Sequence, residues 1–348
     1  MGKPMKQAII AVSLIISCAS GSLAQPDRGP VNQQRPQRDT VLASVGPSTN
    51  MVSIKVVGEM RVIQANGWPD HVPGQFPNRG NPNTIRPQSY TFRMTTKPAV
   101  TGNLTPNNGA FFGVALNGVP FEPGTAEFWN GDRRWNYEAM SGFVNLGLDQ
   151  HNAHVQPTGG YHYHGLPLGL IQKLGGSAKK MTLVGYAADG FPIYTNYGYT
   201  DAKDTNSPIK KLKSSYRVKE GIRQGGPGGK YDGKFTADYE YVKGSGDLDE
   251  CNGRFGPTPE YPGGIYHYYI TEEFPQLSRY WKGTAGDGFR KGPPGGGRGG
   301  PGGPGGPGGP GGFGGPPGGG SGNGRPPGGG RPPGGGPPDG QRPPGKAF

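Results

Sequence analysis

Short runs in which hydrophobic and polar residues alternate predict β-strands along the middle of the chain. Residues 51–65, MVSIKVVGEMRVIQA, alternate well enough for a pair of strands or one long bent strand, and Asn66-Gly67 ends the run. Later runs are equally short and rich in aromatic or β-branched residues, and turn sequences such as Asp-Gly and Gly-Gly bound them. These runs are 90–96, 110–116, 181–187, 191–197, 239–242 and 265–271.

Helical periodicity is weak by comparison. Only residues 272–281 and 134–141 have the spacing needed for one or two helical turns. The pattern therefore predicts a mainly β fold, with a single domain of short strands joined by long ordered loops.

Composition changes this picture at the end of the chain. Residues 292–348 hold 29 Gly and 16 Pro and too few hydrophobic side chains to bury a core. We therefore expect a disordered Gly/Pro-rich tail that acts as a spacer; contact of its scattered Arg residues with the cell surface or an acidic polysaccharide is the alternative. We place the β domain at residues 41–291, about 250 residues, a normal size for one domain.

The first 24 residues have the pattern of a signal peptide. The basic start MGKPMKQ precedes the apolar run AIIAVSLII, and Ser22 and Ala24 form a small-residue cleavage site before Gln25. We therefore expect an exported protein, periplasmic, cell-surface or extracellular, with residues 25–40 as a flexible linker. The alternative is a lipoprotein anchored through Cys18. The apolar run is shorter than the ~20 residues that a membrane span needs, so no membrane span is expected.

The net charge of +12 suggests an anionic partner until its distribution is considered. Residues 41–291 carry only +5 of it, and they lack a dense run of like charges. Because phosphate backbones are bound by such dense basic surfaces, nucleic acid is not an expected partner.

The cysteine content excludes an internal disulfide. After signal cleavage Cys251 is the only cysteine, so it is either a small buried hydrophobic residue or a soft metal ligand.

Histidine clustering is the strongest chemical signal. Four of the six histidines lie between residues 151 and 164, in HNAHVQPTGGYHYHGLP. Side chains two positions apart on a strand share a face, so His162 and His164 form a chelating pair while Tyr161 and Tyr163 point the other way. An isolated histidine in a tyrosine-rich strand is commonly a half-buried aromatic with one hydrogen bond, but a cluster indicates metal binding.

Two further segments extend the proposed ligand set. The Pro-Thr-Gly-Gly turn is expected to fold the preceding residues back, bringing His154, and as a further candidate His151, to the chelating pair. The distant segment GGIYHYYIT repeats the Gly-Gly and Tyr-His-Tyr pattern and offers His267. His154, His162, His164 and His267 would form the four-imidazole set expected for zinc or for non-blue copper.

Acidic residues near these segments are candidates for a supporting role. A carboxylate that orients a ligand or acts as a general base could come from Asp149, Asp189, Asp249 or Glu250, although turn capping explains Asp189 equally well. The chain carries no P-loop, Rossmann or Gly-x-Ser-x-Gly signature in a strand-turn-helix context.

Four of these segments carry a family resemblance. The chain resembles the YHYH family of secreted proteins over roughly residues 90–282. The resemblance implies export and domain identity, and it implies no particular reaction. The segments are LNGVPF (116–121), AHVQPTGGYHYHGLP (153–167), ADGFPIY (188–194) and LDECNGRFGPTPEYPGGIYHYYIT (248–271).

The sequence thus predicts an exported β protein that binds one transition metal ion, copper or zinc, through strand histidines. Three functions fit this prediction. The protein is a metalloenzyme, such as a copper oxidase or a metal hydrolase, if the site has an open position. It is a metal carrier or has a structural metal if the ligand shell is closed. It is a metal-free surface or matrix protein, binding carbohydrate or protein, if the histidines hold no metal.

Overall fold

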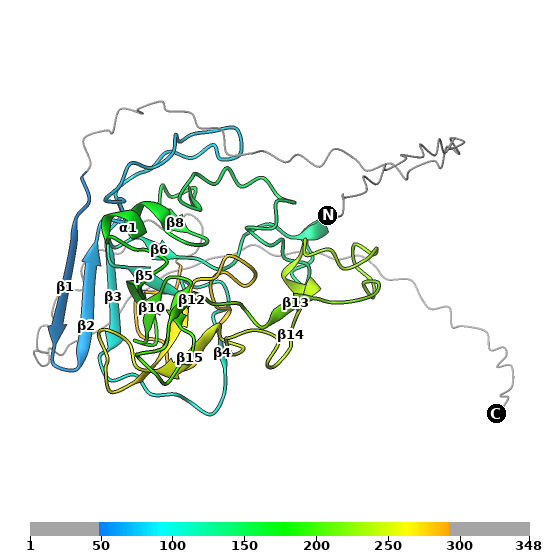
Figure 1. Cartoon of the computed structure of the whole chain (residues 1–348). Helices are drawn as coiled ribbons and strands as arrows, with labels where there is room; N and C mark the ends of the chain where they lie inside the picture. Colours follow the sequence, from blue (N-terminus) through cyan, green and yellow to red (C-terminus); the bar gives the residue numbers. More distant parts are fainter. Residues whose placement is uncertain (1–48, 292–348) are drawn as a thin grey trace, which may run out of the picture. The chain divides into compact units, whose positions relative to one another are not determined.

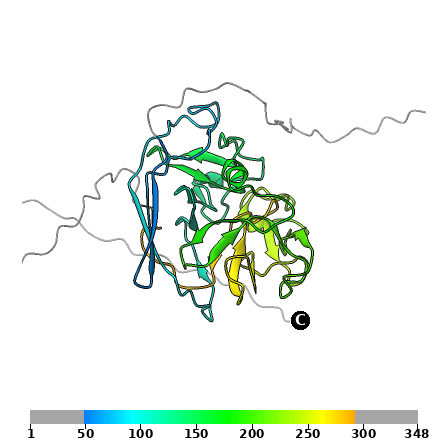
Figure 2. The same cartoon turned by 60° about the vertical axis from the view of Figure 1, so that its left-hand side comes forward.

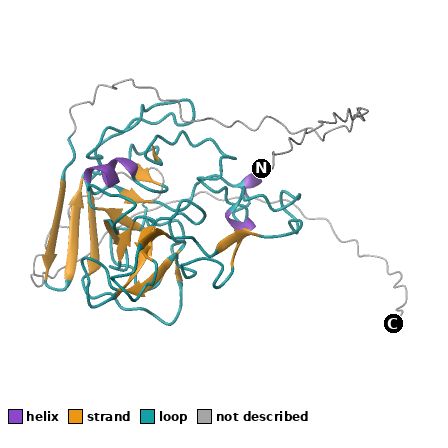
Figure 3. Cartoon of the chain, in the orientation of Figure 1, coloured by secondary structure: helices purple, strands orange, loops and turns teal. Residues whose placement is uncertain are grey.

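The computed structural model describes residues 49–291, which the cartoon shows in colour (Figure 1). The predicted signal peptide, the linker at 25–40, Cys18 and the Gly/Pro-rich tail lie outside the described residues. Within the described part the fold is mainly β, and loops join most of the strands (Figure 3). No helix in this part is long and apolar enough to cross a membrane.

The alternating run that begins at Met51 forms a strand pair rather than one bent strand. Its two strands pair antiparallel from Val52 opposite Ala65 to Val57 opposite Met60, and Gly58, with φ of +60°, makes the turn. A third strand completes an antiparallel sheet that stands along one side of the described part (Figure 2). The strands are β1 (Val52–Val57), β2 (Met60–Ala65) and β3 (Tyr90–Thr95).

The larger sheet has eight short strands in the order β15-β16-β10-β9-β5-β6-β8-β7. Its first and last pairs are antiparallel hairpins, and two of its pairings, β10 with β16 and β6 with β8, are parallel. The strands are β5 (Gly113–Ala115), β6 (Pro120–Phe121), β7 (Ala153–Val155), β8 (Tyr161–Tyr163), β9 (Leu183–Ala187), β10 (Pro192–Tyr194), β15 (Gly253–Gly256) and β16 (Ile265–Tyr269).

Short elements complete the described part. Three two-stranded sheets form from β4 (Thr105–Pro106) with β17 (Tyr280–Trp281), β11 (Tyr197–Tyr199) with β12 (Ile209–Lys211), and β13 (Tyr216–Val218) with β14 (Tyr239–Tyr241). The helical elements are α1 (Leu168–Lys173) and the 3₁₀ turns η1 (Trp129–Gly131) and η2 (Thr236–Asp238).

The two predicted helical segments are wrong. Residues 272–281 form turns that lead into β17, and residues 134–141 contain no helix. Pro275 interrupts the first segment, because proline has no N–H for the helical ladder. The one α-helix of residues 49–291 instead follows Pro167, its N-cap residue, and buries Leu170.

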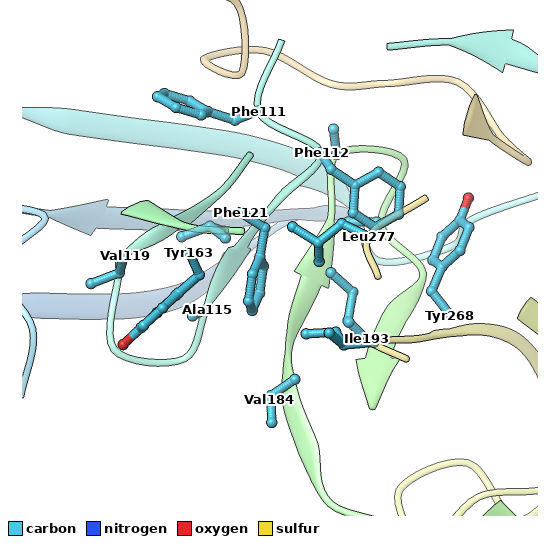
Figure 4. Packing of buried hydrophobic residues seen from close by; sticks show 14 of the residues in the cluster. Phe111, Phe112, Ala115, Val119, Phe121, Tyr163, Val184, Ile193, Tyr268 and Leu277 are labelled. Carbon is cyan, nitrogen blue, oxygen red and sulfur yellow. The ribbon is translucent and has the colours of Figure 1, made fainter. Parts of the chain in front are cut away.

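Both sheets share one hydrophobic core. Ile63 and Phe92 of the three-stranded sheet belong to the same buried cluster as Phe112, Phe121 and many other residues of the larger sheet. Figure 4 shows this cluster, with Tyr163 and Tyr268 at its two sides. All three residues of β8 are buried, so both faces of this strand are covered. Side chains on β8 are therefore held in fixed surroundings away from water.

Candidate metal centre

The β7–β8 hairpin brings two histidines together. The strands pair antiparallel with His154 directly opposite His162. In the turn, the N–H of Gly159 donates to the carbonyl of Gln156 at 2.8 Å, and Gly159 has a φ of +89°, which suits glycine. The Pro-Thr-Gly-Gly turn therefore folds the chain back as the sequence predicted.

Three imidazole nitrogens meet above this hairpin. The Nε2 atom of His164 lies 3.0 Å from Nε2 of His162 and 3.1 Å from Nε2 of His154. Within residues 49–291 these three histidines form a group that can hold a metal ion, with ligand atoms inside 4.8 Å of one another. Nitrogens bound to one tetrahedral metal at 2.0–2.1 Å are about 3.3 Å apart, so a small expansion of the group accommodates an ion. We call these three residues the histidine triad.

Backbone contacts indicate which nitrogen carries hydrogen in two of the three rings. Nδ1 of His154 lies 2.8 Å from the carbonyl oxygen of Leu146, and Nδ1 of His162 lies 3.1 Å from that of Gly160. The amide nitrogen of Asn81 also lies 3.3 Å from Nδ1 of His154, but it donates to the carbonyl of Val155 at the shorter distance of 2.9 Å. A carbonyl oxygen can only accept, so we assign hydrogen to both Nδ1 atoms and lone pairs to both Nε2 atoms. Nδ1 of His164 is buried without a partner among the described residues.

The triad therefore has more lone pairs than hydrogens at its centre. Three Nε2 atoms converge, and at most one of them, on His164, can carry a hydrogen while the rings are neutral. That hydrogen can satisfy only one of the two neighbouring lone pairs well. A cation between the rings would satisfy all three, which is the donor arrangement of a metal site.

Burial keeps the triad neutral. It lowers the pKa of His154 to about 4, with His162 as a further cause, and lowers the pKa of His162 to about 3. Burial, followed by its two histidine neighbours, also holds the pKa of His164 well below the ordinary value. His162 and His164 are each only 2% exposed. At neutral pH the rings are free of the proton that would compete with a metal.

A carboxylate that the sequence analysis missed lies beside the triad. Glu122 follows β6, and its Oε2 atom lies 3.4 Å from Nε2 of His162. The amide of Gln156 donates to the same oxygen at 2.5 Å, and the ammonium group of Lys291 pairs with the other oxygen. Glu122 can act as a fourth ligand or hold a proton next to the metal position. The only sequence feature that could have pointed to Glu122 is its position, directly after the apolar segment LNGVPF.

The four acidic residues proposed from the sequence lie elsewhere. Asp149 accepts a hydrogen bond from Tyr161, and Asp189 accepts one from Tyr268. Asp249 and Glu250 pair with Lys282. In the described residues these acids contact tyrosines or lysine rather than the triad, because the tyrosines of β8 and β16 point away from the histidine face.

His267 is not brought to the triad. Its Nδ1 atom contacts the carbonyl of Ile265 at 2.9 Å, and its Nε2 atom contacts the hydroxyl of Tyr269 at 2.8 Å. Its strand, β16, pairs with β10 and β15, and five inter-strand steps separate it from β8. At about 4.8 Å for each step, the separation is on the order of 20 Å.

His151 and Cys251 also lie outside the triad. The ring of His151 packs against His71 at a centroid distance of 4.1 Å and contacts the carbonyl of Val72. Cys251 is fully buried as a free thiol, and burial raises its pKa, so it fits the expected small hydrophobic residue.

Comparison with known protein families supports the resemblance found in the sequence. The family described as YHYH protein matches residues 91–283, which is more than half of the chain. The chain belongs to the YHYH family. No curated protein and no solved structure matches it. The triad and Glu122 all lie inside the matched YHYH region.

The motif that gives the YHYH family its name, residues 161–164, places its histidines and its tyrosines on opposite faces of one strand. The two motif histidines belong to the triad, and the two tyrosines belong to the hydrophobic core. The hydroxyl of Tyr161 donates to Asp149 at 2.7 Å, and that of Tyr163 lies 2.6 Å from Nε2 of His71. These hydrogen bonds hold β8 of the YHYH domain in place from its tyrosine face. They thereby help to fix the positions of the imidazole rings on the opposite face.

Proposed function

We propose that this YHYH protein is exported and binds one transition metal ion, copper or zinc, through the Nε2 atoms of His154, His162 and His164. One observation carries the proposal. Three Nε2 atoms lie close together, and two of them, those of His154 and His162, point lone pairs rather than hydrogens at the centre of the group, because their Nδ1 atoms contact backbone carbonyls. The export half of the proposal is supported by the sequence pattern of residues 1–24.

The ligand chemistry favours copper or zinc over other common ions. Imidazole nitrogen suits both metals, whereas calcium and magnesium prefer sets of oxygen ligands. The nearest carboxylate, Glu122, offers at most one such group.

The surroundings of the triad favour a metalloenzyme over a metal carrier or a structural metal site. Catalytic zinc sites typically keep three protein ligands and one open position, while structural sites close all four. The triad supplies three ligands, and Glu122 stands next to them with Gln156 and Lys291 holding its carboxylate. A carboxylate in this place can move a proton to or from a metal-bound water, which is the task of a general base in metal-assisted hydrolysis.

The test is a metal titration of the full mature chain. Protein stripped with a chelator is dialysed and offered zinc and copper separately, and bound metal is measured by elemental analysis and calorimetry. We expect near-unit stoichiometry. Replacing both His162 and His164 with Ala should abolish binding, because two of three ligands are lost.

His267→Ala is the matched control. His267 is also a buried strand histidine with an Nδ1 contact to a carbonyl, but it lies outside the triad, so its loss should leave the stoichiometry unchanged. A wild-type chain that holds neither metal would refute the proposal and favour a metal-free surface or matrix protein that binds carbohydrate or protein.

A further inference from the structure

The eight-stranded sheet contains the same four-strand unit twice. The first unit is β5-β6-β8-β7 and the second is β9-β10-β16-β15; in each, two hairpins are joined by parallel pairing of their inner strands. In the parallel pairs, Phe121 lies opposite Tyr163 in the first unit, and Ile193 lies opposite Tyr268 in the second. All four residues belong to the shared core (Figure 4).

An approximate two-fold axis relates the units. They meet where β5 and β9 run antiparallel, with Val114 facing Tyr186 at the centre of the pairing. Equivalent residues therefore occupy equivalent positions on the two sides of this contact. The matching segments are 113–122 with 185–194, 148–156 with 248–256, and 160–164 with 265–269.

The hydrogen bonds behind the two hairpins repeat as well. Tyr161 donates to Asp149 at 2.7 Å, and its counterpart Tyr266 donates to Asp249 at 2.9 Å. The asparagine three residues after each of these aspartates has a φ of +57° in both units. The repeat is thus one of local geometry and not only of strand order.

The histidine triad has a counterpart in the second unit. His162 corresponds to His267, and Nδ1 of each lies against the carbonyl oxygen two residues earlier, at 3.1 and 2.9 Å. The counterparts of the other two ligands are Arg254 and Tyr269. Arg254 lies opposite His267 in the strand register, as the β7 ligand lies opposite His162.

In the second unit, hydrogen-bond donors occupy the position that corresponds to the centre of the triad. The hydroxyl of Tyr269 contacts Nε2 of His267 at 2.8 Å, where it donates because Nδ1 of that ring carries the hydrogen. The Nη2 atom of Arg254 donates to the hydroxyl oxygen of Tyr269 at 3.2 Å and to the carbonyl of Tyr199 at 2.7 Å. Each lone pair meets a hydrogen, and the guanidinium group supplies a permanent positive charge.

We propose that the second unit is a closed copy of the metal site, in which Arg254 and Tyr269 replace two of the three ligands and the guanidinium group takes the place of the cation. This inference rests on the proposed function. It follows that, of the two units, only the first binds metal. Arg254→His together with Tyr269→His should open a second site for the same class of ion, Zn²⁺ or Cu²⁺.

The counterpart of Glu122 in this comparison is Tyr194. A tyrosine thus stands where the first unit has a carboxylate, and its hydroxyl donates to Glu260 at 2.6 Å. An opened second site would therefore lack the counterpart of Glu122.

The experiment measures stoichiometry in the full mature chain, with Zn²⁺ and Cu²⁺ titrated separately. We expect one bound ion in the wild type, two in R254H/Y269H, and one in the fourfold variant that also carries H154A and H164A. R254Q/Y269F is the matched control, which removes the guanidinium and the hydroxyl without adding ligands and should remain at one. Circular dichroism and the melting temperature confirm that each variant is folded.

The outcomes separate the two proposals. One ion in the wild type and one in folded R254H/Y269H would overturn the inference and leave the proposed function standing. Two ions in the wild type would also overturn it, because the second unit would already bind metal. No ion in the wild type would overturn the proposed function itself.

A reverse exchange tests the inference if R254H/Y269H does not fold. H154R/H164Y places the residues of the second unit into the first, so it should fold, bind no metal, and melt in chelator at or above the temperature of the wild type. A lower melting temperature than that of H154A/H164A would contradict the claim that guanidinium and hydroxyl complete this site.

Discussion

Acid should destabilise the metal-free protein through the triad. Burial lowers the pKa of His154 to about 4 and that of His162 to about 3, while both return to about 6.5 when the chain unfolds. The unfolded state therefore binds more protons below pH 6.5. The stabilising contribution of these neutral rings is complete above that pH and is lost as the pH falls toward the folded values.

The expected size follows from proton linkage. When the pH falls from 7 to 5, each of these two rings lowers the free energy of unfolding by about 2 kcal/mol, so the pair lowers it by about 4 kcal/mol. This is a large part of the 5–15 kcal/mol typical of a folded domain. Asp189 acts in the opposite direction, because burial raises its pKa to about 6 and protonation then favours the folded state.

Urea unfolding in chelator at pH 7 and pH 5 provides the measurement. Asp189, His71, His164 and His267 also contribute to the pH dependence. The wild type is therefore compared with H154N/H162Q, in which the introduced Asn and Gln side chains do not titrate in this range. The loss of stability between the two pH values should be smaller in the variant by about 4 kcal/mol. Equal losses in the two proteins would refute the assignment of buried neutral rings to His154 and His162.

Three further predictions concern the surroundings of the site and the ends of the chain. Glu122→Gln should weaken metal affinity by about 10- to 100-fold, because it removes a charge that supports the ligands, and an unchanged dissociation constant in the same titration would contradict this. A chain ending at Lys291, which keeps the contact to Glu122, should melt at the same temperature as the full chain and keep its metal, since residues 292–348 are too poor in hydrophobic residues to add a core. Mass spectrometry of the exported protein should find Gln25 as the first residue and no lipid; an acylated Cys18 at the N-terminus would establish the lipoprotein alternative.

Local sequence patterns were sufficient to predict much of the fold near the site. Alternation predicted β structure in the run that begins at Met51, as a strand pair or one bent strand, and the structure has the pair. It also assigned His162 and Tyr163 to opposite faces of one strand, where the two side chains make separate contacts. Helix prediction was wrong at 272–281 and at 134–141, and it missed α1. The signal in 272–281 came from spacing alone, and Pro275 outweighed it, while the short helix after Pro167 had too few residues to show periodicity.

The hairpin could be predicted from local sequence alone, because a strand period of two puts two histidines on one face and a Gly-Gly turn returns a third to them. The contact of Glu122 with His162, and the position of His267 five inter-strand steps from β8, depend on how distant strands pair. The reason is physical. The side-chain period shows which face of its own strand a residue occupies, but the neighbour of that strand depends on pairings between distant segments. These pairings are selected by burial of the shared core, which no local window of sequence contains.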